Sequence, residues 1–514
     1  MLSTVMSAGI CGIDGFPVSV ECDAQERMAS FEIVGLPDLA VREAKERVRT
    51  ASLNSGFRFP SYAITVNLAP ADRKKEGSGF DVAILCGILQ GSGIIRRDVD
   101  LSRSCFVGEL SLSGSIRGVR GVLCMCVAAK EAGLLNVYVP AENAREAAAV
   151  RGINVYPLGD MVSLVAHLNG TQPIAPLSRD DMEISAPVLA DFPDFADVRG
   201  QSMAKRAMEI AAAGGHNILL IGPPGTGKSM LAKRLPGILP PLTFDEAIET
   251  TKVHSVAGTL PEHTSLLSQR PFRSPHHTMS AVSLVGGGAN PTPGEVSLSH
   301  NGVLFLDELP EFPKTVTDTL RQPLEDRRVT ITRASGRVTF PCSFMLVGAM
   351  NPCRCGYFGH PTKQCTCSAH DVKRYVSRIS GPLLDRMDIE VELPSLSYDE
   401  LADRSPTGES SAVIRERVVR ARAFAAARMS GEREVFCNAQ LDSAGIRKYC
   451  VADEAAMTVL RGAYDRLGLS ARGYDRVMRV ARTIADLEES ELIRAHHVAE
   501  AIQLRSLDRK YGQN

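Results

Sequence analysis

The chain contains 514 residues, which is long enough for three or four domains that each bury a core of their own. Its 58 basic and 59 acidic side chains give a formal net charge of -1, so a uniformly basic nucleic-acid-binding protein is excluded and any DNA-binding surface must be a local patch. The sequence has neither an apolar run that could span a bilayer nor a signal-peptide pattern in residues 1–20, which predicts a cytoplasmic protein whose 13 cysteines stay reduced.

Residues 1–170 alternate short apolar runs with amphipathic stretches, and this alternation predicts an α/β domain. We expect strands over residues 16–22, 31–34, 62–68, 105–112 and 137–140, and helices over residues 38–53, 81–89, 122–132 and 142–149.

The turn at residues 75–81 and the later Val-Gly-Glu-Leu at 107–110 resemble the proteolytic domain of Lon proteases, which need a serine activated by a lysine. Ser78 is available. The stretch where the resemblance would place the lysine, residues 118–124, holds Arg120 and no lysine. Because arginine does not lose its proton in proteins, it cannot act as the base. We therefore expect a Lon-protease-like scaffold domain without a Ser-Lys dyad.

Residues 171–192 carry Pro, Ser and Asp without a sustained period, which is typical of a linker. An Asp-Val-Arg-Gly-Gln segment follows at 197–201 and leads into a helical pattern that ends at Ala213. In AAA+ ATPases a segment like this lies against the adenine, and by that resemblance Val198 and Gln201 would bind nucleotide. The alternative is an ordinary N-capped helix.

An apolar run at residues 217–221 leads directly into Gly-Pro-Pro-Gly-Thr-Gly-Lys-Ser and then into a helix-forming run. This order of strand, glycine-rich loop and helix is typical of a phosphate-binding loop. Its lysine supplies a charge for the β- and γ-phosphates of ATP, and its serine hydroxyl suits Mg²⁺. The nucleotide-binding residues predicted from this loop are Gly222, Pro223, Pro224, Gly225, Thr226, Gly227, Lys228 and Ser229.

A second apolar run, residues 303–306, delivers two carboxylates at its carboxyl end. Asp307 is predicted to hold Mg²⁺ through water, and Glu308 to orient or deprotonate the attacking water. This pair of roles predicts ATP hydrolysis and not merely nucleotide binding.

Between Lys228 and Asp307 the chain has more residues than one helix and one strand need, so we expect an insert. Residues 270–302 include the adjacent His276 and His277 and a glycine-rich run. Neighbouring side chains point in different directions in a strand or a helix, which disfavours a metal site. We expect a polar, mobile loop.

Two alternating β-branched runs separated by Ala-Ser-Gly predict a β-hairpin over residues 327–340. Its apolar face holds Val329, Ile331, Val338 and Phe340, and its tip carries Arg333 and Arg337. The tip is either a solvated surface or a contact for DNA phosphates. The second reading assumes that the hairpin projects from the sheet that carries Asp307.

Four cysteines lie within 15 residues of one another, as Cys353-Arg-Cys355 and Cys365-Thr-Cys367. Four thiolates are a natural tetrahedral set for structural Zn²⁺. His360 or His370 could replace one thiol, and the alternative is a loop of reduced thiols without metal.

Residues 395–514 have a helical pattern and are predicted to form an all-α lid, with helices over 471–487 and 496–507. One helix crowds five arginines, which indicates a solvated or subunit-facing surface. These arginines are Arg415, Arg417, Arg420, Arg422 and Arg428.

Taken together, these motifs resemble the magnesium-chelatase-like AAA+ ATPases, and within them the ComM/YifB competence-protein family. The resemblance covers essentially the whole chain. It implies Asn351 as the residue that senses the γ-phosphate, Arg386 as an arginine finger and Arg472 as the sensor-2 arginine. A finger supplied by a neighbouring subunit implies a ring, with a hexamer as the expected form.

The resulting fold prediction is an α/β protein of three domains: a Lon-protease-like α/β domain at 1–170, an AAA+ P-loop α/β domain with a parallel sheet at 193–394, and an all-α lid at 395–514. By resemblance, the predicted function is a DNA motor that drives branch migration during natural transformation, acting on branched or single-stranded DNA. The alternative is a chelatase-like or chaperone-like ATPase that remodels a protein client without nucleic acid.

Overall fold

The computed structural model describes residues 2–25, 27–177, 192–261, 264–288, 290–333, 336–396, 408–431 and 435–505. The chain forms two compact units, and each takes residues from several segments. Unit 1 comprises Met1–Ala186, Phe244–Leu267 and Thr330–Phe340; unit 2 comprises Pro187–Thr243, Ser268–Val329 and Pro341–Asn514. Most of the predicted linker, and the last two residues of the predicted helix 496–507, lie outside the described residues.

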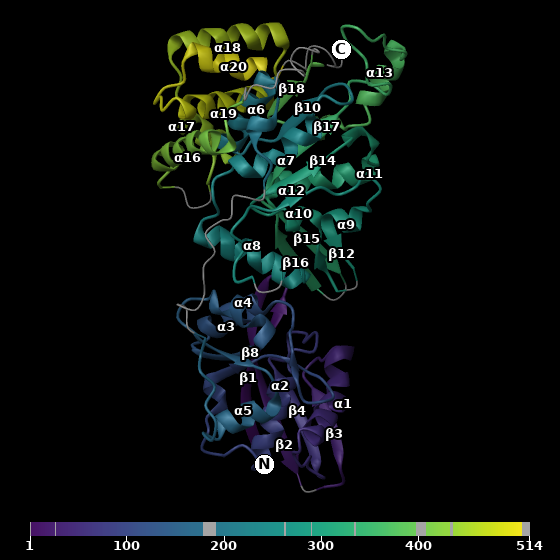
Figure 1. Ribbon diagram of the computed structural model, residues 1–514, viewed down its shortest axis with the longest axis vertical. Helices are drawn as coiled ribbons and strands as arrows, with labels where there is room; N and C mark the ends of the chain where they lie inside the picture. Colours follow the sequence, from purple (N-terminus) through teal and green to yellow (C-terminus); the bar gives the residue numbers. More distant parts are fainter. Residues whose placement is uncertain are drawn as a thin grey trace. The chain divides into compact units, whose positions relative to one another are not determined.

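Among the described residues of unit 1, seven strands form one mixed sheet in the order β3-β4-β2-β1-β5-β8-β9 (Figure 1). The pairs β1-β2 and β2-β4 are antiparallel, and the remaining pairs are parallel. The strands are β1 (Leu2–Cys11), β2 (Asp14–Gln25), β3 (Ser30–Val34), β4 (Ala63–Ala69), β5 (Ser104–Phe106), β8 (Asn136–Pro140) and β9 (Asn154–Leu158); β6 (Glu109–Leu110) and β7 (Ile116–Arg117) form a separate ribbon.

The helices of unit 1 divide between two apolar clusters that this sheet separates. α1 (Leu39–Asn54), α2 (Asp81–Gly91) and α5 (Met161–Leu168) contribute to one cluster, and α3 (Val122–Glu131) and α4 (Ala144–Ala148) to the other. The Asp38 side chain accepts the Val41 amide at 2.8 Å and so caps the start of α1. The α/β prediction for this region is confirmed.

Two later segments complete unit 1. α8 (Phe244–Ala257) packs on α3, and its Ser255 hydroxyl donates to the carboxylate of Glu146 in α4. The second segment comes from the predicted hairpin, which forms as β15 (Arg328–Arg333) and β16 (Gly336–Pro341). Residues 330–340 of this hairpin belong to unit 1. Val338 packs closely against Gly12 there, because a Cβ added at Gly12 would lie 2.9 Å from Cγ1 of Val338.

In the described part of unit 2, five strands form a parallel sheet in the order β11-β14-β17-β10-β18. They are β10 (Ile218–Ile221), β11 (Phe272–Arg273), β14 (Val303–Leu306), β17 (Met345–Met350) and β18 (Ile389–Glu392). The strands β10, β14 and β17 are buried along their whole length, as their continuous apolar sequences require in a parallel sheet.

α6 (Ser202–Gly214) and α7 (Lys228–Ile238) pack against this sheet and share its core with the C-terminal helices. The C-terminal helices gather together in Figure 1, in green to yellow. They are α16 (Ser411–Arg428), α17 (Ser443–Tyr449), α18 (Glu454–Leu467), α19 (Ala471–Leu487) and α20 (Ala495–Gln503).

The segment predicted as a polar, mobile loop, residues 270–302, contains short regular elements in the structure. β11 joins the main sheet, β12 (Gly286–Gly287) pairs with β13 (Thr292–Pro293), and α9 (Ala281–Val285) and α10 (Glu295–Leu298) flank that pair. Elements of two to five residues are too short to show a period in sequence, which explains why the prediction missed them. The remaining short helices of unit 2 are α11 (Lys314–Thr317), α12 (Arg321–Asp326), α13 (Ala369–Val376) and α14 (Gly381–Leu384).

Candidate nucleotide-binding site

The glycine-rich loop at 222–229 joins the carboxyl end of β10 to the first residue of α7, as predicted. Gly225 and Gly227 have φ angles of 82° and 90°, in the left-handed region that glycine adopts without strain. Gly227 is the N-cap of α7, so the first amides of this helix are free to bind an anion at the loop.

The Lys228 side chain is buried beneath this loop. Its Nζ donates to the carbonyl oxygens of Gly222 and Pro223, at 2.7 and 2.9 Å, and to Oδ1 of Asn351 at 3.1 Å. Burial lowers the pKa of Lys228 to about 8, although the charges of Asp307 and Glu308 act in the opposite direction. The ammonium group is therefore held in place by hydrogen bonds to its own chain.

The Ser229 hydroxyl donates to Oδ2 of Asp307 at 2.6 Å. Asp307 directly follows β14, and its other oxygen accepts the amide of Glu308 at 2.9 Å. A hydroxyl and a carboxylate placed together supply the hard oxygen ligands that Mg²⁺ prefers, so these residues fit the ion.

Glu308 adopts φ 52° and ψ 44°, a left-handed conformation that is uncommon for residues other than glycine. Its side chain is 59% exposed, and Oε2 lies 3.6 Å from Nδ1 of His277. The sequence predicts His276 and His277 only as contacts of a polar loop. The proximity of His277 to Glu308 was not predicted, because these two residues lie far apart in the sequence.

Gln201 is buried and bridges two parts of the site. Its Nε2 donates to the Pro394 carbonyl at 2.8 Å and to the Thr226 carbonyl at 3.3 Å. Val198 is fully buried in the core of unit 2. The structure thus places Gln201 against the phosphate loop, while an adenine contact for Val198 or Gln201 stays a prediction.

The four predicted cysteine ligands come together. The Sγ of Cys353 lies 3.3 Å from that of Cys355 and 3.7 Å from that of Cys365, and all four sulfur atoms, including that of Cys367, lie within 4.8 Å of one another. A tetrahedral site with Zn–S bonds of about 2.3 Å separates its sulfurs by about 3.8 Å, so the set fits Zn²⁺.

The two histidines considered as replacement ligands lie outside this group of four. Nδ1 of His360 accepts the amides of Thr362 and Lys363 at 3.1 and 3.0 Å, and its Nε2 contacts the Ser395 hydroxyl at 2.8 Å. His370 is exposed in α13.

Burial alone would raise the pKa of Cys355, but backbone amides of Tyr357 and Thr366 and the neighbouring thiols outweigh it and lower the pKa to about 5. Thiolate is the form of cysteine that binds metal, so this environment agrees with the geometry of the cluster.

Comparison with known proteins reveals full-length relatives. Competence protein ComM of Haemophilus influenzae is 43% identical over 511 residues, and the uncharacterized protein YifB of Salmonella typhimurium is 41% identical over 511 residues. Each alignment covers 99% of this chain and 98% of the relative. The chain belongs to the ComM/YifB family.

The three matching family descriptions are those of magnesium-chelatase subunit ChlI: "Magnesium chelatase, subunit ChlI" over residues 194–401, "Subunit ChlI of Mg-chelatase" over 20–143 and "Magnesium chelatase, subunit ChlI C-terminal" over 408–505. Lon protease 2 of Bacillus subtilis is 28% identical over 154 residues, covering 27% of this chain and 26% of the relative. These matches confirm the predicted magnesium-chelatase-like AAA+ fold.

In this ComM/YifB protein, the two arginines expected near the γ-phosphate have different surroundings. Arg386 forms an ion pair with Glu325 and donates to the Pro382 carbonyl within its own chain. Arg472 is exposed in the first turn of α19. One turn later, Arg476 is buried, and its Nη2 lies 3.3 Å from Oδ1 of Asp385, beside the Arg386 segment.

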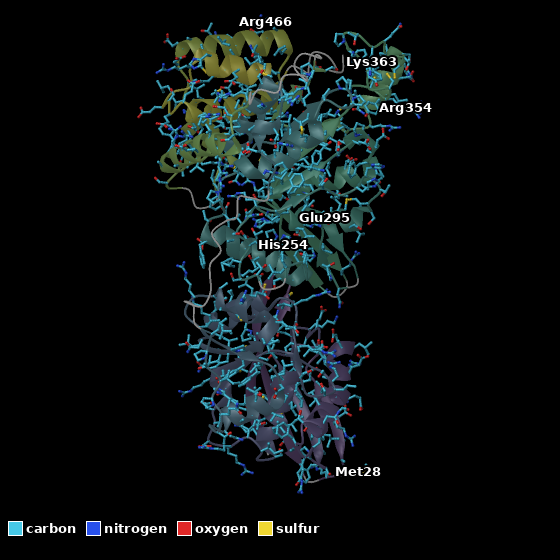
Figure 2. The ribbon with its side chains drawn as sticks, viewed as in Figure 1. Met28, His254, Glu295, Arg354, Lys363 and Arg466 are labelled. Carbon is cyan, nitrogen blue, oxygen red and sulfur yellow. The ribbon has the colours of Figure 1, made fainter. Side chains whose placement is uncertain are left out.

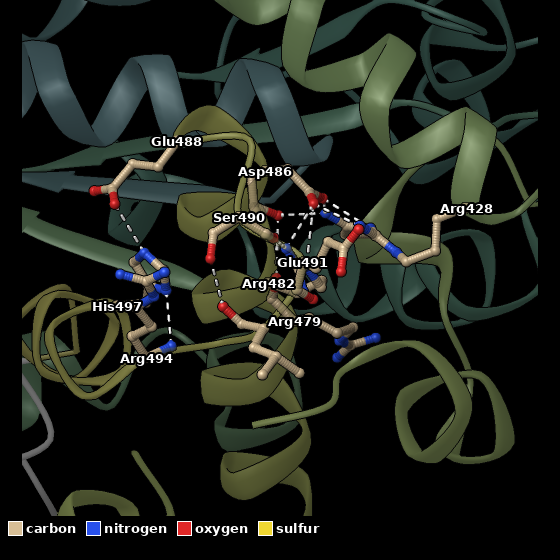
Figure 3. A network of polar contacts seen from close by, with 12 residues as sticks. Arg428, Arg479, Arg482, Asp486, Glu488, Ser490, Glu491, Arg494 and His497 are labelled. Carbon is tan, nitrogen blue, oxygen red and sulfur yellow. Dashed lines mark hydrogen bonds and ion pairs between the residues drawn. The ribbon is translucent and has the colours of Figure 1, made fainter. Parts of the chain in front are cut away.

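Sequence reasoning missed a buried ionic network in the helical region of the ComM/YifB chain (Figure 3). Arg428 Nη1 lies 2.6 Å from Oδ1 of Asp486, and Arg482 Nε lies 3.0 Å from the same oxygen. Arg482 and Asp486 are 0% and 1% exposed. The network therefore holds the ends of α16 and α19 together in the core.

The same network reaches the base of the phosphate-loop strand through His216, because Asn438 donates both to Asp486 at 2.7 Å and to the Thr483 hydroxyl at 3.0 Å. The fully buried His216 side chain contacts Oδ2 of Asp388 at 3.2 Å and the Thr483 hydroxyl at 2.7 Å. Burial would raise the pKa of Asp388, but His216 and nearby arginines lower it to about 2. β10, β18 and α19 are thus joined by one polar contact chain.

The arginine-rich helix, predicted as a solvated or subunit-facing surface, corresponds to α16, and three of its arginines instead pair with groups of their own chain. Arg417 pairs with Glu209 at 2.5 Å and Glu409 at 2.6 Å, and Arg428 pairs with Asp486. Arg422 donates to the carbonyls of Ala212 and Phe436, at 3.1 and 3.2 Å. Arg415 is partly buried and Arg420 is exposed.

A further cluster brings Glu488, at the end of α19, together with His496 and His497 of α20; Glu488 and His497 are labelled in Figure 3. Nδ1 of His497 accepts the Arg494 amide at 2.9 Å, which places the proton of the neutral ring on Nε2, facing Glu488 at 3.0 Å. The arrangement caps the start of α20 and leaves His497 no lone pair for a metal.

The predicted hairpin forms, with Arg333 and Arg337 exposed near its tip. β15 and β16 form a two-stranded sheet of their own, and the chain continues from β16 into β17 of the sheet that carries Asp307. The hairpin's apolar face is buried at Val329, Ile331 and Phe340, so the face was predicted correctly.

The Lon-like region of unit 1 holds Ser78, whose hydroxyl donates to the Glu109 carboxylate. Lys75 lies close to Ser78 in the sequence and is buried, but its Nζ donates to the carbonyls of Pro70 and Arg73. Burial lowers the pKa of Lys75. Among the described residues, no lysine is bonded to Ser78, and the role of this region as a scaffold stays a prediction.

Proposed function

We propose that this AAA+ ATPase of the competence-protein family is a ring-forming motor that couples ATP hydrolysis to the movement of branched DNA. The observation that carries the proposal is the meeting of Lys228, Ser229, Asp307 and Asn351 at the carboxyl edge of one parallel sheet. This edge is where ligands bind in open α/β sheets.

In the proposed reaction, the Lys228 ammonium binds the β- and γ-phosphates, and Ser229 and Asp307 hold the metal ion. Mg²⁺, when bound, neutralises charge on the phosphate oxygens. Glu308 orients the attacking water and accepts its proton, and Asn351 fixes the position of the γ-phosphate. Positioned groups of this kind supply most of the rate enhancement in phosphoryl transfer.

The proposed assembly is a hexameric ring in the cytoplasm in which Arg386 reaches the nucleotide of a neighbouring subunit. Its pairing with Glu325 and its place directly after α14 support a role outside its own nucleotide site. None of the helices in the described parts of the chain is long and apolar enough to cross a membrane.

The DNA substrate is supported by the relative named competence protein and by the two exposed arginines at the hairpin tip. The second candidate is a chelatase-like or chaperone-like ATPase with a protein client. It is favoured by the magnesium-chelatase descriptions that match all three regions of the chain.

DNA stimulation of the ATPase separates the two candidates. We expect the steady-state rate to rise on adding a four-way DNA junction and the protein to unwind the junction arms only with hydrolysable ATP. The Lys228→Ala protein is the control for contaminating ATPases. A rate that is unchanged by branched, single-stranded and duplex DNA would favour the protein-remodelling candidate.

We further propose that Cys353, Cys355, Cys365 and Cys367 hold one structural Zn²⁺ per chain. Elemental analysis of protein purified without added zinc or chelator is expected to give about one equivalent. Cys355→Ser should lower this value, while Cys11→Ser, at an exposed thiol in unit 1, should leave it unchanged. A fully folded, metal-free parental protein would exclude the site.

A further inference from the structure

The cysteine loop, defined as residues 353–367, touches the phosphate loop directly. Gly356 has φ 86°, and a Cβ added there would lie 2.6 Å from Cδ and 2.9 Å from Cγ of Pro224. Carbon atoms in normal contact are about 3.5–4.0 Å apart, so the backbone of Gly356 is packed against the rigid proline ring. Arg354 and Lys363, both exposed, mark the position of this loop in Figure 2.

A second contact reaches the phosphate loop from another side. His360 accepts two backbone amides at Nδ1, so the proton of its neutral ring lies on Nε2, which donates to the Ser395 hydroxyl at 2.8 Å. Ser395 follows Pro394, whose carbonyl accepts from Gln201, and Gln201 also donates to the Thr226 carbonyl. The cysteine loop is therefore connected to both Pro224 and Thr226.

The third connection runs through the chain itself. Cys353 lies two residues after Asn351, which accepts the hydrogen bond from Lys228, and Cys353 is fully buried. The first sulfur of the cluster and the residue that faces the γ-phosphate thus occupy one short segment at the end of β17.

We propose that the cysteine loop is a positioning element of the nucleotide site, so that the geometry of its four sulfurs sets nucleotide affinity through Gly356 and His360. The proposal rests on the nucleotide-binding function proposed above. Because coupling between two sites is reciprocal, a cation held by the four thiolates and a nucleotide in the phosphate loop favour each other's binding.

Gly356→Ala tests the direct contact. A methyl group at this position must displace Pro224, so we expect the dissociation constant of a fluorescent ADP analogue to rise about tenfold or more, with zinc content unchanged. Gly468→Ala is the matched control, because Gly468 also has a positive φ, of 60°, but a Cβ added there would lie in open space. This variant also places an alanine in the left-handed region, and it should change the dissociation constant by less than about twofold.

A double-mutant cycle separates contact from general disturbance. In a Pro224→Ala protein, the proline ring that obstructs the new methyl group is absent. Gly356→Ala should therefore raise the dissociation constant there by less than about a third of the rise it causes in the parental protein. Equal effects in both backgrounds, or no effect in either, would overturn the proposal. Comparing His360→Ala with His360→Gln, which keeps a donor, tests the second contact: Gln should restore affinity and Ala should not.

The reciprocal measurement uses the full-length protein loaded with zinc. We expect saturating ADP to slow the transfer of Zn²⁺ to a zinc-selective chelator, and zinc-stripped protein that remains folded to bind ADP more weakly. If the parental protein bound no nucleotide at all, the proposed nucleotide-binding function would be wrong. Identical release rates with and without ADP, in a protein that does bind ADP, would contradict only the coupling, so the two results are distinguishable.

Discussion

Nζ of Lys228 lies 3.1 Å from Oδ1 of Asn351, so the phosphate loop and the end of β17 are joined by a hydrogen bond. Both groups are predicted to contact the γ-phosphate of ATP. A bound phosphate would therefore replace contacts that the chain already makes, which costs little reorganisation.

Lys228→Ala and Glu308→Gln are expected to fail at different steps. Removing the Lys228 ammonium takes away the charge that binds phosphate, so nucleotide binding should be lost. Replacing Glu308 with its amide removes the base but not the binding groups, so ATP should bind while hydrolysis falls by about 100-fold or more. Equilibrium binding and single-turnover hydrolysis check the two steps. Parental turnover by Glu308→Gln would contradict the assignment of this carboxylate.

Nucleotide affinity should depend on pH through Lys228. Its pKa of about 8 in the free protein means that the ammonium is charged below pH 8 and loses its proton above it. Bound phosphate favours the charged form and raises this pKa, so affinity should be constant below pH 7 and fall as pH rises from 7.5 to 9.5. Calorimetry of the Glu308→Gln protein with ATP in two buffers of different ionisation enthalpy should show proton uptake at pH 8.5. Constant affinity with no proton uptake would exclude a titrating Lys228.

Replacing both Arg333 and Arg337 with Ala tests the hairpin tip as a DNA contact. Each lost phosphate contact should reduce by about 1 the slope of the logarithm of DNA affinity against the logarithm of salt concentration. It should weaken binding to all DNA sequences alike. Basal ATPase should be unchanged, because the tip lies on a separate two-stranded sheet. Arg466→Ala at an exposed arginine of α18 is the control. Parental DNA affinity of the double mutant across a salt titration would identify the tip as a solvated surface.

Asp486→Ala should destabilise the helical region strongly. Asp486 is the acceptor for Arg428 and Arg482, and its loss leaves the Arg482 charge buried without its carboxylate. Breaking such a pair typically costs about 3–5 kcal/mol. Chemical denaturation should show this loss. Asp465→Ala, at an exposed position in α18, should change stability by less than about 0.5 kcal/mol. Equal stability of the two variants would show that the network contributes little.

The sequence predicted elements well where one period or one motif extends over the whole element. The helix expected over 471–487 coincides with α19, and the strand, loop and helix around Lys228 are where the motif placed them. β1 was missed although it is central in the sheet of unit 1. Its alternation is interrupted by Ser3 and Ser7, which are buried and donate to the carbonyls of Gly87 and Phe106, at 2.7 and 2.8 Å.

Contacts between distant residues were beyond the reach of the sequence patterns. The local charge pattern predicted a solvated or subunit-facing arginine helix, because the partners of Arg417 and Arg428, Glu209 and Asp486, lie on other helices. The approach of His277 to Glu308 likewise has no local signal. The cysteine spacing did predict the four-sulfur cluster, since its members are close in the chain.

Unit 1 is discontinuous in the sequence, and this has a consequence for its synthesis. Its last segment, Thr330–Phe340, leaves the ribosome only after most of unit 2's sheet strands have been made. The apolar side chains that α8 and the hairpin cover are therefore without their final partners during much of translation. A truncated chain that ends near residue 186 would keep those surfaces bare permanently, so the Lon-like part of this protein is not a module that can be cut out with a single break.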